Sequence, residues 1–406
     1  MSTPSLLNIP YVIKAGTLYS QIPETGAGDF TVTRATTPTA NRSTRINADG
    51  FIELVNDNVP RLDYPLGGAV NGCASLLVEP SATNLVLRSE EFDNAYWVKV
   101  SGGVASAPVV TLNAEISPDG TMNADRIVFN LNGGVLAADL SQLESASITH
   151  AAAAHTRSIY ARTTDGTNKV FNFVSPSGAV QLITITPTWQ RFTATDSSSA
   201  SSPFRLRLRG NEGTASSATI ALWGAQYEAG SVATSYIPTS TQSIARGADV
   251  IRKTSITSLL GQSEGTVYFE VEVTDEARNR WFFTIDSASN SFIQAWISPT
   301  RTINIQIQNN SSIVMATLGS SALSVGYHKV AFAYNTATNV CIMYIDGVQN
   351  PVATRTIAAP GLPAFNNMSF GTYFSTTVDT LKAHVRAGAV YPNRLSNSEL
   401  ATLTTP

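Results

Sequence analysis

Short runs of alternating hydrophobic and polar residues recur along the whole chain. In residues 204–209 the side chains of Phe204, Leu206 and Leu208 alternate with arginines, and in residues 302–308 isoleucines alternate with polar residues. Successive side chains of a strand point to opposite faces of a sheet, so such runs predict strands with one buried and one solvated face. The arginines would make the solvated face cationic at the first of these strands. The pattern predicts an all-β protein.

Turn-forming pairs separate several of these runs. Asp-Gly pairs stand at 49–50, between RIN and FIELV, and at 346–347, after the run CIMYI. Asp-Gly between two strand-like runs predicts a tight hairpin. One short helix is expected in residues 394–403, where Ser396 can cap the first turn and Glu399 stands three residues later, the spacing of a capping box.

The spacing of strands and turns predicts three regions. An N-terminal β-rich attachment and connector region is expected in residues 1–97, followed by two antiparallel β-sandwich domains of the jelly-roll type in residues 98–245 and 246–406. The last part, residues 262–406, has a full series of strand-like runs and its own capped end. We therefore expect it to fold alone.

Charge is sparse for a chain of 406 residues. Charged residues make up 14% and the net charge is −3, against about 25% charged residues in typical soluble domains. No basic field exists for a nucleic-acid backbone, and no apolar stretch reaches the length of a membrane span, so neither partner is expected. The first residues lack the features of a signal peptide, which predicts synthesis in the cytoplasm without export by that route.

Cysteine and histidine offer little for metal or redox chemistry. Cys73 and Cys341, the two cysteines, stand in apolar surroundings, and we predict buried free thiols rather than a disulfide. The four histidines show no zinc-binding spacing.

The C-terminal third resembles a concanavalin A-like domain of the laminin-G type. The similarity lies in the opening strand GTVYFEVEV at 265–273, the hairpin strand CIMYIDG at 341–347 and the close VYPNRLSNSELATL at 390–403. This resemblance implies a lectin-like jelly roll.

The middle of the chain resembles the jelly-roll carbohydrate-binding modules of bacteriophage virion proteins. The strings that carry this similarity are SIYAR at 158–162, TPTWQRFT at 186–193 and IALWGAQYEAGSVATSYIPT at 220–239. SLLVEPSATNLVLRSEEFDNAYW at 75–97 is similar to the segment that precedes such modules in phage tail fibres, tail spikes and head fibres.

The two resemblances together imply a structural protein of a phage virion, placed on the virion surface as a fibre, spike or decoration protein. Its partners would be other virion proteins of the capsid or tail, a host cell-surface glycan and further copies of itself, a trimer being one arrangement. Residues 1 to about 60 would attach the protein to the particle, or would fold back onto residues 61–97. Two alternatives stay open: a glycan depolymerase, or a capsid or tail cementing protein without a ligand.

The string EVEVTD is the sharpest indication of an enzyme. Glu270, Glu272 and Asp275 reproduce the carboxylate spacing of concanavalin A-like β-glucanases, and strand alternation puts the first two on one face. The middle residue is Glu where those enzymes have Asp, and their aromatic flank is missing. We therefore interpret TVYFEVEV as an ordinary strand with a solvated acidic face, and expect no enzyme.

Sugar binding needs exposed aromatic faces beside amides or charged groups. Trp281 meets this description because it begins a strand directly after Arg278, Asn279 and Arg280. These four residues are the candidate glycan site, with an edge cap of the core as the competing interpretation. The other tryptophans are Trp97, Trp189, Trp223 and Trp296, of which Trp189 and Trp223 stand where the resembling modules keep core aromatics.

Laminin-G-type domains often hold calcium at one rim, and this resemblance is the basis for a candidate Ca²⁺ site. The hard oxygen donors near predicted strand ends are Asp275, Glu276, Asp286 and Asn290. The competing interpretation is ordinary turn chemistry by Asp and Asn.

Overall fold

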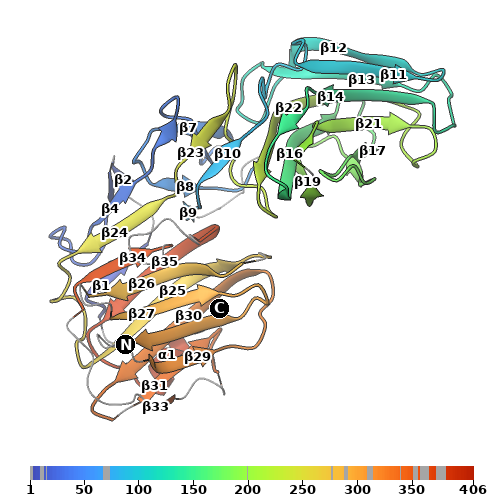
Figure 1. Cartoon of the computed structure of the whole chain (residues 1–406). Coiled ribbons are helices and arrows are strands. Elements are labelled where there is room, and N and C mark those ends of the chain that lie inside the picture. The colour runs from blue at the N-terminus through green and yellow to red at the C-terminus, as the bar shows by residue number, and fades with distance from the viewer. Residues whose placement is uncertain are drawn as a thin grey trace.

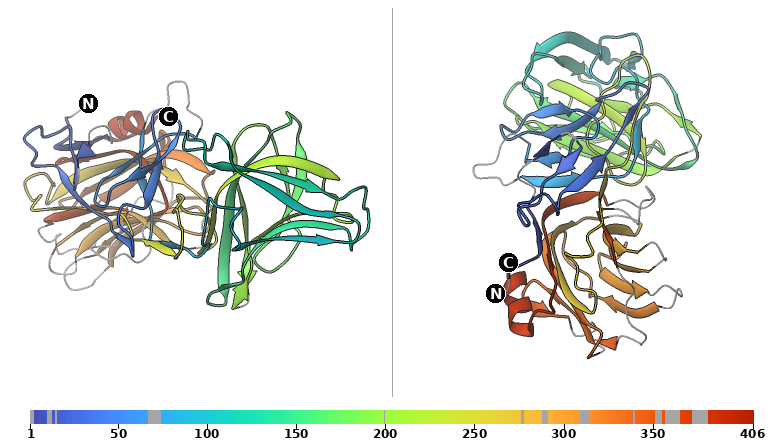
Figure 2. Two further views of the ribbon diagram at one scale, coloured as in Figure 1. Left: turned by 90° about the horizontal axis from the view of Figure 1, so that it is seen from above. Right: turned by 90° about the vertical axis from the view of Figure 1, so that its left-hand side faces the viewer.

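Strands dominate the structure, a computed structural model shown in Figure 1, and the predicted all-β class is confirmed. Two β-sandwiches lie end to end, joined by a smaller connector, and a second pair of views shows the same arrangement (Figure 2). The residues that the structure describes are 3–9, 13–14, 16–66, 74–198, 200–275, 278–287, 291–308, 314–338, 340–350, 355–356, 365–371 and 381–406.

The central sandwich is built from two antiparallel five-stranded sheets. The first has the order β11 (Trp97–Gly102), β14 (Leu140–Ser145), β21 (Arg205–Arg209), β17 (Lys169–Phe173) and β18 (Leu182–Ile185). The second has the order β12 (Ser106–Glu115), β13 (Ala124–Asn130), β22 (Ser217–Ala229), β16 (Ala153–Thr163) and β19 (Gln190–Ser198). A small ladder pairs β15 (Ile148–Thr149) with β20 (Ser201–Ser202).

The predicted alternation explains how this sandwich closes. In β21 the side chains of Leu206 and Leu208 are fully buried while the arginines between them are only half-buried. Inward-facing residues of both sheets, among them Phe171 of β17 and Phe129 of β13, form one apolar cluster. Burying one face of each sheet against the other is the main stabilising contribution of this arrangement.

The C-terminal sandwich has two larger sheets, which we name sheet A and sheet B. Sheet A has the order β32 (Val348–Gln349), β31 (Val340–Ile345), β30 (Gly326–Asn335), β25 (Glu264–Val273), β35 (Ala383–Tyr391), β9 (Ser75–Val78) and β8 (Arg61–Asp63), with β1 (Leu6–Asn8) beside β35 and β33 (Arg355–Thr356) beside β31. Sheet B has the order β2 (Ile13–Lys14), β3 (Thr17–Leu18), β4 (Phe30–Thr33), β24 (Val250–Thr254), β34 (Asn367–Phe370), β26 (Arg280–Asp286), β27 (Phe292–Ile297), β28 (Ile303–Gln308) and β29 (Val314–Gly319).

Strands from the first 97 residues therefore belong to the C-terminal sandwich, which corrects the expectation of a separate region 1–97. Leu6 of β1 pairs with Val390 of β35, and Val32 of β4 pairs with Ile251 of β24. Such short strands cannot bury a core alone, so they extend sheets that the C-terminal strands supply. Their buried side chains join the C-terminal core: Leu6, Leu18, Phe30, Val32, Leu62, Leu76 and Val78.

Both Asp-Gly hairpins form as predicted. In the first, β6 (Ser43–Ile46) pairs with β7 (Ile52–Val55) around Gly50, whose φ is +83°. In the second, Asp346 and Gly347 take φ of +50° and +81° between β31 and β32. Positive φ at both central residues of a two-residue loop fits the right-handed twist of paired strands, which explains the preference for Asp-Gly.

The predicted helix is α1 (Asn397–Thr404), and it begins with the predicted capping box. The Ser396 side chain accepts from the backbone N–H of Glu399, and the Glu399 side chain accepts from the backbone N–H of Ser396. The buried Leu400 packs with Tyr268 and Tyr344 on the outer face of sheet A. The helix thus covers an apolar face that would otherwise meet water.

The connector between the sandwiches holds one three-stranded sheet. Its order is β10 (Ala82–Asn84), β23 (Ile244–Arg246) and β5 (Thr36–Thr37). The hairpin β6–β7 packs onto the central sandwich beside it, where Ile52 joins Tyr160, Trp223 and Tyr236 in one apolar cluster. Segments far apart in sequence thus meet between the two sandwiches.

Two smaller expectations concern cysteine and membranes. Cys341 is buried, as predicted, and Cys73 lies outside the described residues. Among the described residues no helix is long and apolar enough to cross a membrane.

Candidate functional site

Trp281, the central residue of the predicted glycan site, lies on the outer face of sheet B. It is the second residue of β26 and stacks on Trp296 of β27, with ring centroids 6.0 Å apart and planes 30° from parallel. Both rings are half-buried. The pair forms an aromatic surface on the side of the sheet that faces away from the core.

A row of amides lies beside the two rings. The indole N–H of Trp281 donates to Oε1 of Gln294 at 3.1 Å, and Nε2 of Gln294 donates to Oε1 of Gln306 at 2.9 Å. Strand alternation produces this row, because Ile293, Ala295, Ile297 and the isoleucines of β28 fill the core from the opposite face. Gln294 is buried, at 5% exposure, whereas Gln306 is half-buried and its amide can still pair with a ligand.

The other predicted glycan residues lie at the start of β26. Arg278 and Asn279 are exposed, and Arg280 is half-buried as the first residue of the strand. They stand next to Trp281 in sequence, and Arg280 pairs through its backbone with Ile297 of β27. Sequence reasoning missed Trp296, Gln294 and Gln306, although the alternating run FIQAWI at 292–297 carried the signal.

The remaining tryptophans serve packing. Trp97 and Trp223 are buried, at 1% and 2% exposure. Trp189 is half-buried at the edge of the central sandwich, where its N–H donates to the carbonyl of Ile116 at 3.0 Å and Arg162 lies over its ring.

The candidate calcium ligands that the structure describes are each paired with an arginine. Asp275 is exposed and bonds to Arg301 at 2.6 Å, while both carboxylate oxygens of Asp286 accept from Arg252 at 3.0 Å. Glu276 and Asn290 lie outside the described residues. No group of three or more His, Cys, Asp or Glu that could hold a metal occurs within the described part of the chain.

The two strand glutamates face the same side of sheet A, as predicted, and each meets a cation. Glu270 lies 3.4 Å from Arg386, and Glu272 lies 2.7 Å from Nδ1 of His384. Burial alone would raise the pKa of Glu272, but the hydrogen bond and the charge of His384 lower it. Both glutamates therefore have a structural partner within the sheet.

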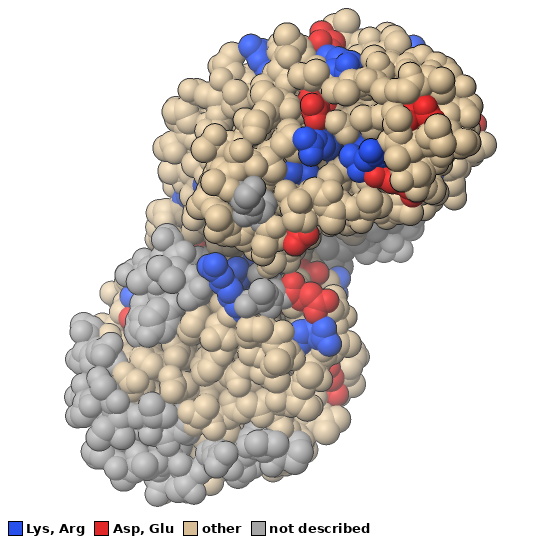
Figure 3. Space-filling model, turned by 45° about the vertical axis from the view of Figure 1, so that its right-hand side comes forward, with Lys and Arg blue, Asp and Glu red and all other residues tan. Residues whose placement is uncertain are grey.

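The arginines of β21 are also neutralised, so the expected cationic face is a mixed one. Arg205 bonds to Glu144 at 2.9 Å, and Arg207 makes two hydrogen bonds to Glu212, at 2.5 and 3.0 Å. Figure 3 shows blue and red side chains side by side on this sandwich, within a surface that is mostly uncharged. The pairing of opposite charges leaves little net field there.

A buried cluster of charges fixes the connector, and we name it the ionic hub: Arg34, Arg61, Glu79, Arg246 and Asp249. Asp249 accepts from Arg34 at 2.8 Å and from Arg61, while Glu79 bonds to Arg61 at 2.8 Å and to Arg246. All five side chains are at most 5% exposed. Burial alone would raise the pKa of Glu79, but the charges of Arg246 and Arg61 hold it well below its usual range.

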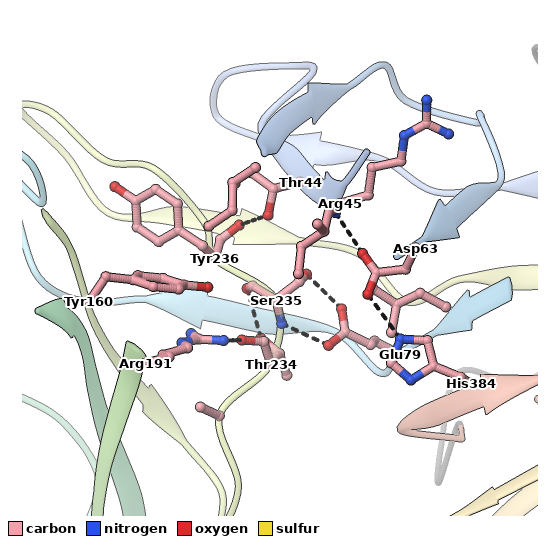
Figure 4. Close-up of a pocket in the computed structure, with 14 residues that line it drawn as sticks. Thr44, Arg45, Asp63, Glu79, Tyr160, Arg191, Thr234, Ser235, Tyr236 and His384 are labelled. Carbon is pink, nitrogen blue, oxygen red and sulfur yellow. Dashed lines mark hydrogen bonds and ion pairs between the residues drawn. The ribbon is translucent and has the colours of Figure 1, made fainter. Parts of the chain in front are cut away.

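A cavity of about 200 Å³ opens next to this hub, where the connector meets both sandwiches. Figure 4 shows its lining: Tyr160 and Arg191 come from the central sandwich, Ser235 from the segment after β22, and His384 from the C-terminal sandwich. Ser235 is held by Glu79, which accepts from its N–H and its hydroxyl at 2.7 Å each.

Comparisons with known proteins do not assign the chain to a family. No family model matches it, and no curated protein is similar to it. Among solved structures it is similar to the CBM40 domain of the Ruminococcus gnavus IT-sialidase bound to alpha2,3 sialyllactose, with a TM-score of 0.33 and 15% identity over 38% of this chain and 91% of that chain.

Two larger sialidases show the same level of likeness. The leech intramolecular trans-sialidase has a TM-score of 0.30 at 19% identity, over 36% of this chain and 23% of that chain. The NanB sialidase of Streptococcus pneumoniae has a TM-score of 0.32 at 14% identity, over 38% and 27%. At these scores the likenesses support no functional argument.

Proposed function

We propose that the chain is a non-enzymatic structural protein of a phage virion that binds host-surface glycans through the outer face of sheet B. The observation that carries the glycan proposal is the stacked pair Trp281 and Trp296 beside the hydrogen-bonded amides of Gln294 and Gln306. Sugar rings present C–H faces that stack on aromatic rings, and their hydroxyls pair with amides. The face offers both kinds of contact within three adjacent strands.

The contrast with sheet A supports this choice of face. The outer side of sheet A carries Tyr268 and Tyr344, but Leu400 of α1 packs on them. On sheet B both tryptophans keep part of their surface exposed. Aromatic groups that stay partly exposed on a sheet commonly mark a binding surface.

The virion part of the proposal rests on the sequence resemblances alone. The strings at 75–97 and 220–239 are similar to those of phage fibre and spike proteins. Under this proposal the protein lies on the virion surface, bound to other virion proteins and to further copies of itself.

The absence of enzymatic activity is part of the proposal, and the carboxylate contacts support it. A glycosidase needs one carboxylic acid to donate a proton and one carboxylate as nucleophile or base. Glu272 is bonded to His384 and Glu270 lies beside Arg386, so both are engaged with cations in the sheet.

The test measures binding of the purified full-length chain to a panel of immobilised bacterial surface polysaccharides. Trp296→Ala should weaken binding roughly tenfold or more, as loss of a central aromatic contact does at other binding surfaces. Trp189→Ala removes a half-buried tryptophan from the other sandwich and is the matched control. Equal binding by both variants would contradict the proposed face.

The same samples test the enzymatic alternative. Incubation with each bound polysaccharide should release no reducing ends. If the wild-type chain released reducing ends and Glu270→Gln did not, the protein would be a depolymerase and not a binding protein without enzymatic activity.

A further inference from the structure

A second binding site lies between the two sandwiches, away from the outer face of sheet B. We propose that the junction cavity binds an uncharged, polyhydroxylated ring the size of one monosaccharide. The argument rests on an unpartnered phenol that points into the cavity, on the balance of the charges around it, and on its size.

The first observation that supports a ligand in this cavity is the position of Tyr160. Its side chain is 5% exposed and lines the cavity. Figure 4 shows its phenol oxygen directed toward the centre of the cavity, between Arg191 and Tyr236. Within the described part of the chain this oxygen makes no hydrogen bond. The hydroxyl opens onto the cavity, where a ligand or solvent can supply the missing hydrogen bond.

Arg191 lines the same wall as Tyr160. Its guanidinium lies over the Tyr160 ring, 5.3 Å from the centroid, and donates to the carbonyl of Thr234 at 2.6 Å and to the hydroxyl of Ser158 at 2.9 Å. Its Nε is buried and has no partner among the described residues. A ligand hydroxyl, which can donate and accept, suits the Tyr160 phenol beside this guanidinium.

The opposite wall is charged but balanced. Nε2 of His384 lies 3.0 Å from Asp63, and its Nδ1 lies 2.7 Å from Glu272. Asp63 also accepts the backbone N–H of Ile46 at 2.6 Å. The charged side chains that line the cavity are Arg45, Asp63, Glu79, Arg191 and His384. Arg45 is paired with Glu53, and Glu79 with Arg61 and Arg246. An anionic ligand would meet the carboxylates of Asp63 and Glu79, and a cationic ligand would meet Arg191 and His384. An uncharged ligand avoids both repulsions and the cost of burying a charge.

Size and apolar lining complete the argument. The cavity measures about 200 Å³, which is below the range of roughly 300–1,000 Å³ for drug-sized ligands. Side chains of Ile46, Ile52 and Leu77 line part of it. A single ring with an apolar face and a hydroxylated rim matches this lining better than an extended chain or a fully apolar molecule.

This site needs both sandwiches and the connector in place. Tyr160 and Arg191 belong to β16 and β19, Ser235 to the segment after β22, and His384 to β35. Ligand binding would therefore favour the docked arrangement of the two sandwiches, since the ligand contacts both.

The test uses the full-length chain with glucose, galactose and N-acetylglucosamine as probes, and glucuronate as a charged comparison, in saturation-transfer NMR and calorimetric titration. At least one uncharged sugar should bind saturably, and glucuronate should bind more weakly. Tyr160→Phe, which removes one oxygen, should weaken binding roughly three- to tenfold. Tyr268→Phe, a buried tyrosine outside the cavity, is the matched control.

Two further variants separate this site from the outer face of sheet B. Ala233→Phe places a ring in the cavity and should abolish binding, whereas Trp296→Ala should leave it unchanged. Absence of binding by all uncharged sugars, preference for glucuronate, or unchanged binding in Ala233→Phe would each overturn the proposal. Loss of binding in Trp296→Ala alone would assign the sugar to sheet B instead.

Discussion

Nε2 of His384 lies 3.0 Å from Oδ2 of Asp63, although 321 residues separate the two in sequence. Asp63 belongs to β8 and His384 to β35, on either side of β9 in sheet A. The contact therefore joins an N-terminal strand to the C-terminal sandwich by a charged hydrogen bond as well as by apolar packing.

This contact makes stability depend on pH in a defined window. Burial alone would lower the pKa of His384, but its hydrogen bonds to Asp63 and Glu272 and their charges raise it from 6.5 to about 9. A raised pKa stabilises the fold fully below about pH 6.5, and this stabilisation is lost as the pH rises through 9. The loss should amount to at most about 3 kcal/mol, since each pKa unit corresponds to about 1.4 kcal/mol.

Urea unfolding at pH 6 and pH 9.5 measures the effect. His384→Gln should be less stable than the wild type at pH 6 and should lose less stability between the two values. His150→Gln is the control, because Nε2 of His150 lies 2.9 Å from the hydroxyl of Tyr227, in the central sandwich. An unchanged pH dependence in His384→Gln would contradict the prediction.

Residues 262–406 should not fold alone, contrary to the expectation from the sequence. The fragment lacks β1, β3, β4, β8, β9 and β24, whose buried side chains include Leu6, Phe30 and Val78. Each large side chain contributes roughly 1.5–3 kcal/mol on burial, and a domain is stable by only about 5–15 kcal/mol.

Thermal unfolding of the purified fragment tests this directly. We expect an insoluble product or a non-cooperative transition, whereas the full-length chain should unfold cooperatively. Adding the peptides 1–66 and 74–84 in trans should restore part of the signal. A cooperative transition of the bare fragment would show that the N-terminal strands are dispensable.

The ionic hub should be intolerant of losing one charge. Asp249→Asn removes the carboxylate that holds Arg34 and Arg61. The buried Arg34 then loses its counter-charge, while Arg61 keeps only Glu79. Breaking a buried pair in this way typically costs about 3–5 kcal/mol. Denaturant unfolding should show a loss of this size.

An exposed ion pair provides the control for the hub. Glu91 bonds to Arg88 at 2.8 Å, with side chains 42% and 30% exposed. Glu91→Gln should change the free energy of unfolding by less than about 1 kcal/mol. Similar losses in both variants would mean that the hub contributes no more than a surface pair.

The capping interaction of Ser396 should stabilise the C-terminal helix α1 by about 1 kcal/mol. Ser396→Ala removes the hydroxyl that accepts from the Glu399 N–H, and such substitutions typically cost about 0.5–2 kcal/mol. Amide hydrogen exchange should accelerate in residues 397–404 while exchange in β25 stays unchanged. Thr402→Ala, within the same helix, should have a smaller effect, and equal acceleration would exclude a specific role of the cap.

Local features of the fold could be predicted from the sequence because they depend on neighbouring residues. Alternation in residues 204–209 and 302–308 determines which side chains of β21 and β28 face the core. The Asp-Gly pairs and the capping box specify backbone conformations within a few residues. For the same reason Trp281 could be placed at the start of a strand.

The partners of each strand were decided only by the tertiary structure. Nothing in the sequence near Leu6 indicates that its strand pairs with β35, because many strands of similar pattern compete for each sheet edge. The stacking of Trp281 on Trp296, the ionic hub and the junction cavity all depend on such pairings. The residues of these features come from segments that are distant in sequence. They meet because the whole chain buries its apolar surface together, and no local sequence pattern encodes that arrangement.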